Sequence, residues 1–147
     1  MRTIIFIGLG FAICLSQPLI AAPTTSSLSA KQLLDACSQF SQAEMHQCLN
    51  EKEAESLNAL QLAEKNVVRI LSNWDEDDKY IHLSKTAFAI SRKEFAKYRR
   101  AQCEFSASLS GGGAGGAYQM GLLSCAAELN NRRAEQLHHA VINLPLK

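Results

Sequence analysis

Residues 42–73, QAEMHQCLNEKEAESLNALQLAEKNVVRILSN, decide the fold of this 147-residue chain. Apolar side chains recur in this segment at spacings of three, four and seven residues, which is the pattern of an amphipathic helix. The segment contains no Gly or Pro, and Ser41 with Glu44 forms a capping-box pattern at its start. Such a helix spans on the order of 45 Å, so other long helices must cover its apolar face.

Two further long helices are indicated after this segment. Helix 79–108 is expected to follow the acidic run, which suits the N-terminus of a helix. Its apolar stripe is expected to contain Ile81, Ala87, Phe88, Phe95, Tyr98, Cys103 and Phe105, with Arg92, Lys93, Arg99 and Arg100 on the opposite face. The third stripe begins at Leu122, after the glycine-rich run 110–116, and ends before Pro145.

A short helix is expected ahead of residue 42, because Ser29 and Gln32 form another capping-box pattern and an apolar face follows as far as Cys37. No segment alternates between apolar and polar residues with a period of two, so we predict no sheet. Helices joined by short loops pack antiparallel. The sequence therefore predicts an all-α fold, an up-down-up bundle of three long helices plus a short N-terminal helix.

The amino terminus has the organisation of a signal peptide. Met1-Arg2 supplies a positive charge, residues 4–15 are almost uninterruptedly apolar, and Ser16-Gln17-Pro18 ends the run before it could span a membrane. We expect a signal peptide over 1–22, a flexible leader over 23–28 and one helical domain over 29–147. Lipid attachment at Cys14 is disfavoured, because bulky Ile13 precedes it. The protein is expected to be periplasmic or secreted, without stable membrane insertion after cleavage.

Four cysteines remain after cleavage, and an even number in an oxidising compartment predicts two disulfides. Cys103 and Cys125 lie at similar distances on either side of the glycine-rich run, so antiparallel helices would place them at similar heights. We prefer the pairs Cys103–Cys125 and Cys37–Cys48. The alternative pairings would crosslink the first long helix to the other two.

Composition and motifs argue against several classes of function. Loss of Arg2 lowers the 15 Lys and Arg residues by one, to equal the 14 Asp and Glu residues, so no nucleic acid partner is expected. No cofactor or metal is expected, because the histidines form no ligand set: His46, His82, His138 and His139. The chain lacks nucleophile-elbow, phosphate-loop and dinucleotide motifs, so we expect no enzyme activity.

Several segments resemble the LprI-type lysozyme inhibitor family. Residues 41–48, SQAEMHQC, resemble its opening Thr-Gln-x-Glu-Met-Asn-x-Cys, and residues 95–105, FAKYRRAQCEF, resemble its Trp-x-x-Tyr-Arg-Asp-x-x-Cys-x-Phe. The closing helix of the family is resembled by Ser124, Cys125, Leu129, Arg133 and Leu137. The chain departs from the family pattern at Leu57, Gln61, Phe95, Arg100 and Asn130. The resemblance spans most of the mature chain and keeps its cysteines.

The resemblance implies inhibition of a lysozyme or other peptidoglycan hydrolase through occlusion of its cleft. Two surface features are candidate contacts: a thin glycine-rich loop and an acidic turn that could attract a basic lysozyme. Their residues are Gly111, Gly112, Gly113, Gly115 and Gly116 in the loop, and Asp75, Glu76, Asp77 and Asp78 in the turn. Both also have structural readings, as a flexible connector and as a helix start.

Two other functions stay open at this stage. One is a non-catalytic adaptor or structural protein of the cell envelope that binds a protein partner through its helix faces. The other is an immunity protein against a rival's or its own hydrolase. Arg133 lies near the apolar stripe of the last helix, where an unpaired guanidinium is costly, so we expect a structural ion pair with Glu44 or Glu104.

Overall fold

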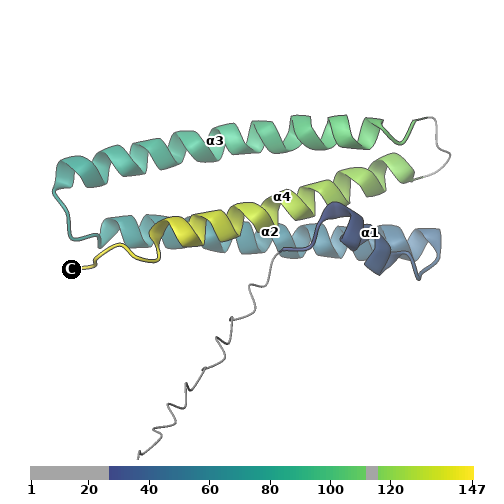
Figure 1. The fold of residues 1–147 in the computed structure, drawn as a ribbon, viewed down its shortest axis with the longest axis horizontal. Helices are drawn as coiled ribbons and strands as arrows, with labels where there is room; N and C mark the ends of the chain where they lie inside the picture. The colour runs from purple at the N-terminus through teal and green to yellow at the C-terminus, as the bar shows by residue number, and fades with distance from the viewer. Residues whose placement is uncertain (1–26, 112–115) are drawn as a thin grey trace, which may run out of the picture.

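The computed structural model describes residues 27–111 and 116–147. Within these ranges the chain forms the helices α1 (Ala30–Cys37), α2 (Gln42–Ser72), α3 (Asp78–Ser108) and α4 (Ala117–Val141), and no strand. Figure 1 shows the three long helices running up, down and up, with α1 against one end. The predicted all-α bundle is therefore confirmed. The expected signal peptide and most of the leader lie outside the described residues.

Serine caps begin the first two helices where the sequence places them. At α1, the Ser29 backbone N–H donates to Gln32 Oε1 at 2.9 Å, and the Gln32 backbone N–H donates to Ser29 Oγ at 3.3 Å. At α2, Ser41 donates to Glu44 Oε2 from its hydroxyl at 2.6 Å and from its backbone N–H at 3.1 Å. Both bonds lower the pKa of the Glu44 carboxyl, and the bond from the Ser41 hydroxyl has the larger effect.

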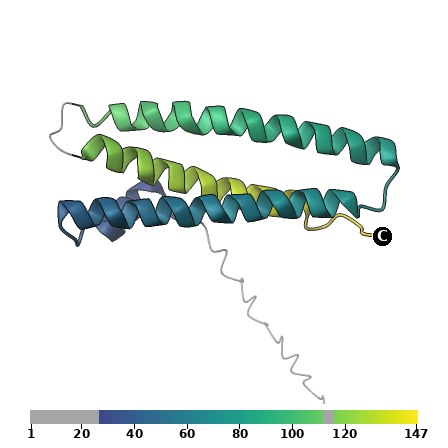
Figure 2. The ribbon, with the colours of Figure 1, turned by 180° about the vertical axis from the view of Figure 1, so that it is seen from behind.

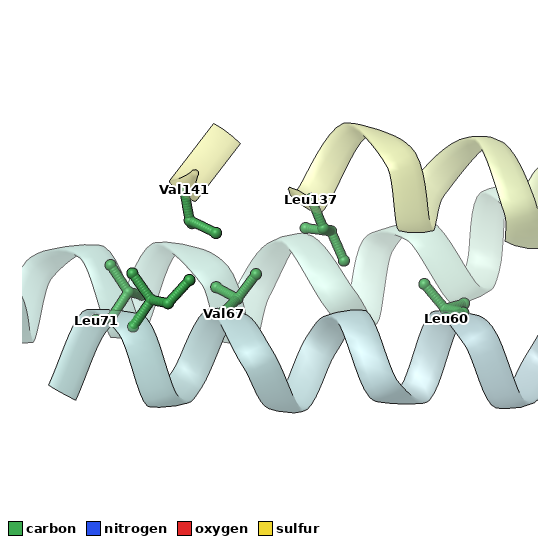
Figure 3. Close-up of a cluster of buried hydrophobic side chains, with 6 residues drawn as sticks. Leu60, Val67, Leu71, Leu137 and Val141 are labelled. Carbon is green, nitrogen blue, oxygen red and sulfur yellow. The ribbon is translucent and has the colours of Figure 1, made fainter. Parts of the chain in front are cut away.

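The main core lies between α2 and α4. Figure 3 shows Leu60, Val67 and Leu71 of α2 facing Leu137 and Val141 of α4. A second buried cluster joins α1 to the start of α2 and to α4 through Leu33, Cys37, Leu49 and Ala127. Each fully buried Leu or Val contributes about 1.5–3 kcal/mol, so α2 and α4 form the stable centre of the molecule.

Helix α3 packs mainly on α4, which lies between α2 and α3 in both ribbon views (Figures 1 and 2). Few α3 side chains are fully buried: Ile81, Cys103 and Ala107. The predicted stripe of α3 is partly wrong, because Ala87, Tyr98 and Phe105 are exposed and Arg99 is half-buried. Small and polar side chains such as Ser91 occupy the inner face instead, so the apolar residues of α3 are divided between two faces.

The two ends of the bundle are held differently. Disulfides Cys37–Cys48 and Cys103–Cys125 form with Cα–Cα distances of 5.9 Å and 5.5 Å, which confirms the preferred pairing. Both lie at the end that carries α1, the start of α2 and the end of α3, which we call the stapled end (Figures 1 and 2). At the other end the C-terminal segment folds back, with the Lys147 N–H bonded to the Asn73 carbonyl at 2.9 Å.

Candidate functional site

A buried polar chain connects the three long helices. Asn130 of α4 is fully buried; its amide nitrogen donates to Ser56 Oγ of α2 at 3.0 Å, and its amide oxygen accepts from Arg99 Nη1 of α3. Ser56 Oγ in turn donates to the Glu53 carbonyl at 2.7 Å. Each buried polar group in this series has a hydrogen-bond partner. These hydrogen bonds therefore fix the register of the three helices. The series holds no group that is free to react.

Arg133 has partners other than the predicted carboxylates. Its Nη2 donates to Ser91 Oγ of α3, and its guanidinium lies 5.5 Å from the centre of the Phe95 ring. Glu44 is engaged with Ser41 at the start of α2, and Glu104 is exposed on α3. The structure thus gives Arg133 a hydroxyl and an aromatic face in place of the predicted ion pair. The cross-helix ion pair here is Arg92–Glu64, at 2.9 Å.

The two predicted contact features lie at opposite ends of the molecule. Gly111 lies in the turn after α3, with a φ of +62° that favours glycine, and Gly116 precedes α4. The other loop positions, Gly112, Gly113 and Gly115, lie outside the described residues. The acidic turn is separated from Gly111 by the length of α3, about 46 Å for its 31 residues. The structure therefore does not bring them together in one site.

The acidic turn has structural partners. Asp77 occupies the N-cap of α3, and Asp78 lies in its first turn, where a carboxylate is favourable. The backbone N–H of Asp75 donates to the Pro145 carbonyl at 2.9 Å, and Trp74 pairs with Leu146. The turn thus starts α3 and anchors the C-terminal segment.

A groove at the stapled end was not foreseen from the sequence. It lies between α1, α3 and α4 and encloses about 560 Å³, a size typical of pockets that receive a ligand or a partner side chain. Tyr98 and Gln102 line it from α3, Met120 and Arg132 from α4, and Leu34 from α1. The groove depends on how α1, α3 and α4 pack together, and no local sequence pattern encodes that arrangement.

Helix α3 also presents apolar side chains to solvent along most of its length. We call this set the outer stripe; it comprises Tyr80, Leu83, Ile90, Tyr98, Phe105 and Leu109, which are 49% to 72% exposed. The members recur at helical spacings and so share one side of the helix. Large apolar side chains exposed along one side of a helix offer a surface on which a partner can pack. The outer stripe is therefore a candidate interface.

The described residues offer neither a metal-binding cluster nor a membrane-spanning helix. In the part of the chain that the structure describes, no three His, Cys, Asp or Glu side chains lie close enough together to hold a metal ion. The described helices contain no segment with both the length and the apolar character needed to cross a bilayer. The imidazole rings of His138 and His139 meet edge to face, with centroids 5.6 Å apart.

Comparison with known proteins places the cysteine-bonded helices in one family. A family model described as lysozyme inhibitor LprI matches residues 35–137. The chain belongs to the LprI family. The match contains all of α2 and α3, most of α4 and both disulfides, so it covers the features that define the LprI fold here. Neither the curated proteins nor the solved structures include a significant match.

Proposed function

We propose that this LprI-family protein inhibits a lysozyme-type peptidoglycan hydrolase in the periplasm or outside the cell. The family match over residues 35–137 carries the proposal. Two disulfides support a location outside the cytoplasm, because such bonds persist in oxidising compartments. Enzymes that degrade the cell wall act in the same compartments.

Inhibition proceeds by binding, without a chemical step. A lysozyme cleaves its substrate between two carboxyl groups in an extended cleft, so a protein that fills the cleft excludes the glycan. The four cysteines of the described residues are oxidised, which removes them as nucleophiles. A scaffold fixed by two disulfides loses little conformational freedom on binding, which favours affinity.

The glycine-rich connection and the acidic turn are the two candidate contacts proposed from the sequence. Because about 46 Å separates them, one cleft engages one of them at most. The acidic turn already caps α3 and holds the C-terminal segment, which supports the glycine-bearing stapled end as the contact.

The test is an inhibition assay with the mature protein, beginning near Pro23, purified with its disulfides intact. We expect micromolar protein to slow cell-wall lysis by at least one lysozyme in a panel that covers several structural classes. Protein that has been reduced and alkylated is the matched control and is expected to lose the effect. If no hydrolase in the panel is slowed by the oxidised protein, the proposal is wrong.

A second candidate function is an envelope adaptor that binds a protein other than a hydrolase. The outer stripe of α3 favours it, because a long exposed apolar surface suits a partner helix as well as a cleft. Affinity capture from envelope extracts separates the two functions. Recovery of a muramidase supports inhibition, whereas reproducible recovery of a non-hydrolytic envelope protein supports the adaptor.

A further inference from the structure

We infer that the hydrolase contacts the C-terminal half of the outer stripe, comprising Tyr98, Phe105 and Leu109, together with the groove beside Tyr98. We call this surface the α3 ridge. The inference rests on the proposed function and specifies its binding surface. It assigns the contact to described side chains of α3 and α4, and it assigns no contact to the acidic turn.

Exposure of aromatic side chains is the first argument. Tyr98 is 53% exposed and Phe105 is 61% exposed, although both belong to a helix whose opposite side packs on α4. Tyr118, at the start of α4, is also exposed. Aromatic residues are enriched in protein interfaces and carry a large share of their binding energy. The stapled end therefore offers several anchors for a partner.

The shape of the ridge fits the shape of a cleft. Tyr98 belongs to the outer stripe and also lines the groove of about 560 Å³. A protruding surface and a concave surface therefore lie side by side. An enzyme cleft has a hollow and a lip in the same relation. The ridge can enter the substrate cleft of the enzyme while the edge of that cleft enters the groove. Both sides of Tyr98 would then be buried.

The chemistry of the ridge suits a glycan-binding cleft. Such a cleft carries hydrogen-bonding groups for sugar hydroxyls and amides, and flat apolar surfaces for sugar rings. Tyr98 offers a ring with a hydroxyl, and Gln102 offers an amide beside it. The groove also presents Arg132, whose Nη1 lies 3.1 Å from Glu128 Oε1, a carboxylate that lines the same groove. The ridge therefore meets the cleft mainly through apolar side chains and uncharged polar groups.

The ridge is also held rigidly. The Cys103–Cys125 disulfide joins α3 to α4 between Tyr98 and Phe105 in the sequence. The two helices pack closely at Gly121 of α4, where a Cβ would lie 3.4 Å from Ala107 Cα, in ordinary contact. The N-terminal half of the stripe, with Tyr80, has no such crosslink. Preorganisation thus favours binding at the C-terminal half.

Two tyrosines of α3 provide a matched experiment. Tyr80 and Tyr98 are 49% and 53% exposed and are 18 residues apart, which is about five helical turns, so they lie on the same side roughly 27 Å apart. We expect Tyr98→Ala to raise the inhibition constant about tenfold or more, and Phe105→Ser to act in the same direction. Tyr80→Ala is expected to change it less than about twofold. Circular dichroism melts verify that each variant folds.

The outcomes separate this inference from the proposed function. If the native protein inhibits a hydrolase but Tyr98→Ala and Tyr80→Ala have equal effects, the ridge is wrong and the proposed function stands. If the native protein inhibits none, both fail. A change from dimer to monomer in Tyr98→Ala, with inhibition unchanged, would make the ridge a contact between two copies and overturn the inference. Loss of binding to anionic vesicles, again with inhibition unchanged, would likewise overturn it.

Discussion

Asn130 shows how one buried side chain can set the relation of three helices. Its amide bonds Ser56 on one side and Arg99 on the other, and no water is needed to satisfy either group. An apolar residue here would leave the Arg99 guanidinium without this acceptor in a half-buried position. The residue therefore has a structural role, at a position where the chain departs from the pattern of the family it resembles.

Replacing Asn130 tests that role. We expect Asn130→Ala to lower the free energy of unfolding by about 1–3 kcal/mol, because the partners of a buried amide lose their hydrogen bonds. Urea denaturation followed by circular dichroism measures the change. Asn58→Ala, at an exposed position of α2, is the control and is expected to stay within about 0.5 kcal/mol of the native protein. Equal stabilities of the two variants would contradict the account.

Glu44 links the start of α2 to pH. The two bonds from Ser41 lower its pKa below the usual value of 4.5, so folding favours the ionised carboxylate. This contribution to stability is present above the usual pKa and is lost as the pH falls through the lowered pKa. We expect Glu44→Gln, which keeps an acceptor, to flatten this part of the decline in melting temperature between about pH 5 and about pH 3.

Glu104→Gln serves as the control for that titration, because no hydrogen bond or ion pair joins the Glu104 carboxylate to another described side chain. Its melting temperature should follow the native pH profile. A Glu44→Gln profile indistinguishable from that of Glu104→Gln would show that the capping box contributes nothing to the acid response.

At the scale of elements, α2 could be predicted well and α3 only in part. The buried apolar residues of α2 form one stripe because α2 packs mainly on α4, so periodicity identified them but not the buried Ser56. In α3 the apolar residues fall on two sides, and periodicity cannot tell which side faces the bundle. Side chains such as Arg99 and Ser91 face inward because Asn130 and Arg133 of α4 meet them. Those partners are distant in sequence, so only the fold shows them.

Gly121 lies where α4 packs closely on α3. A Cβ there meets Ala107 Cα and Cβ at 3.4 Å, which is ordinary contact, so alanine fits. We expect Gly121→Ala to stabilise the protein by about 0.5–1 kcal/mol through its higher helix propensity. Gly121→Leu should destabilise it by about 1–3 kcal/mol, because the larger side chain forces the two helices apart. Urea denaturation measures both variants, and a stable Gly121→Leu protein would contradict the close approach.

At the scale of the whole molecule, the cysteine pairing could be predicted because two helices joined by one loop place residues at matching heights. The groove could not be predicted from the sequence, because it depends on three elements at once. One of them, α1, is positioned partly by the hydrogen bond from the Ala30 N–H to Glu128 Oε2 at 2.9 Å. The direction of the exposed aromatic residues was missed for the same reason. Local patterns thus predicted the helices and their order, and tertiary packing determined the surface.

Removing either disulfide should show how much that bond contributes to the stability of the protein. Loops of 11 and 22 residues predict a loss of about 3 kcal/mol for each pair changed to serine. Because α3 meets α4 through few buried apolar side chains, we expect Cys103→Ser with Cys125→Ser to raise amide hydrogen exchange throughout α3. The double replacement Cys37→Ser with Cys48→Ser should instead raise amide hydrogen exchange in α1. If the first pair leaves α3 protected, the helix is held by more than the crosslink and its polar contacts.

The far end of the bundle offers a practical handle. Lys147 lies beside Asn73 and the acidic turn, at the end of the bundle opposite α1 (Figure 1). A biotin acceptor sequence fused after Lys147 would therefore attach the molecule to a sensor chip by this end. The α3 ridge would then stay accessible to the analyte. A tag placed near α1 would instead crowd the groove. The direction of attachment alone should then determine whether a captured protein can report on its target.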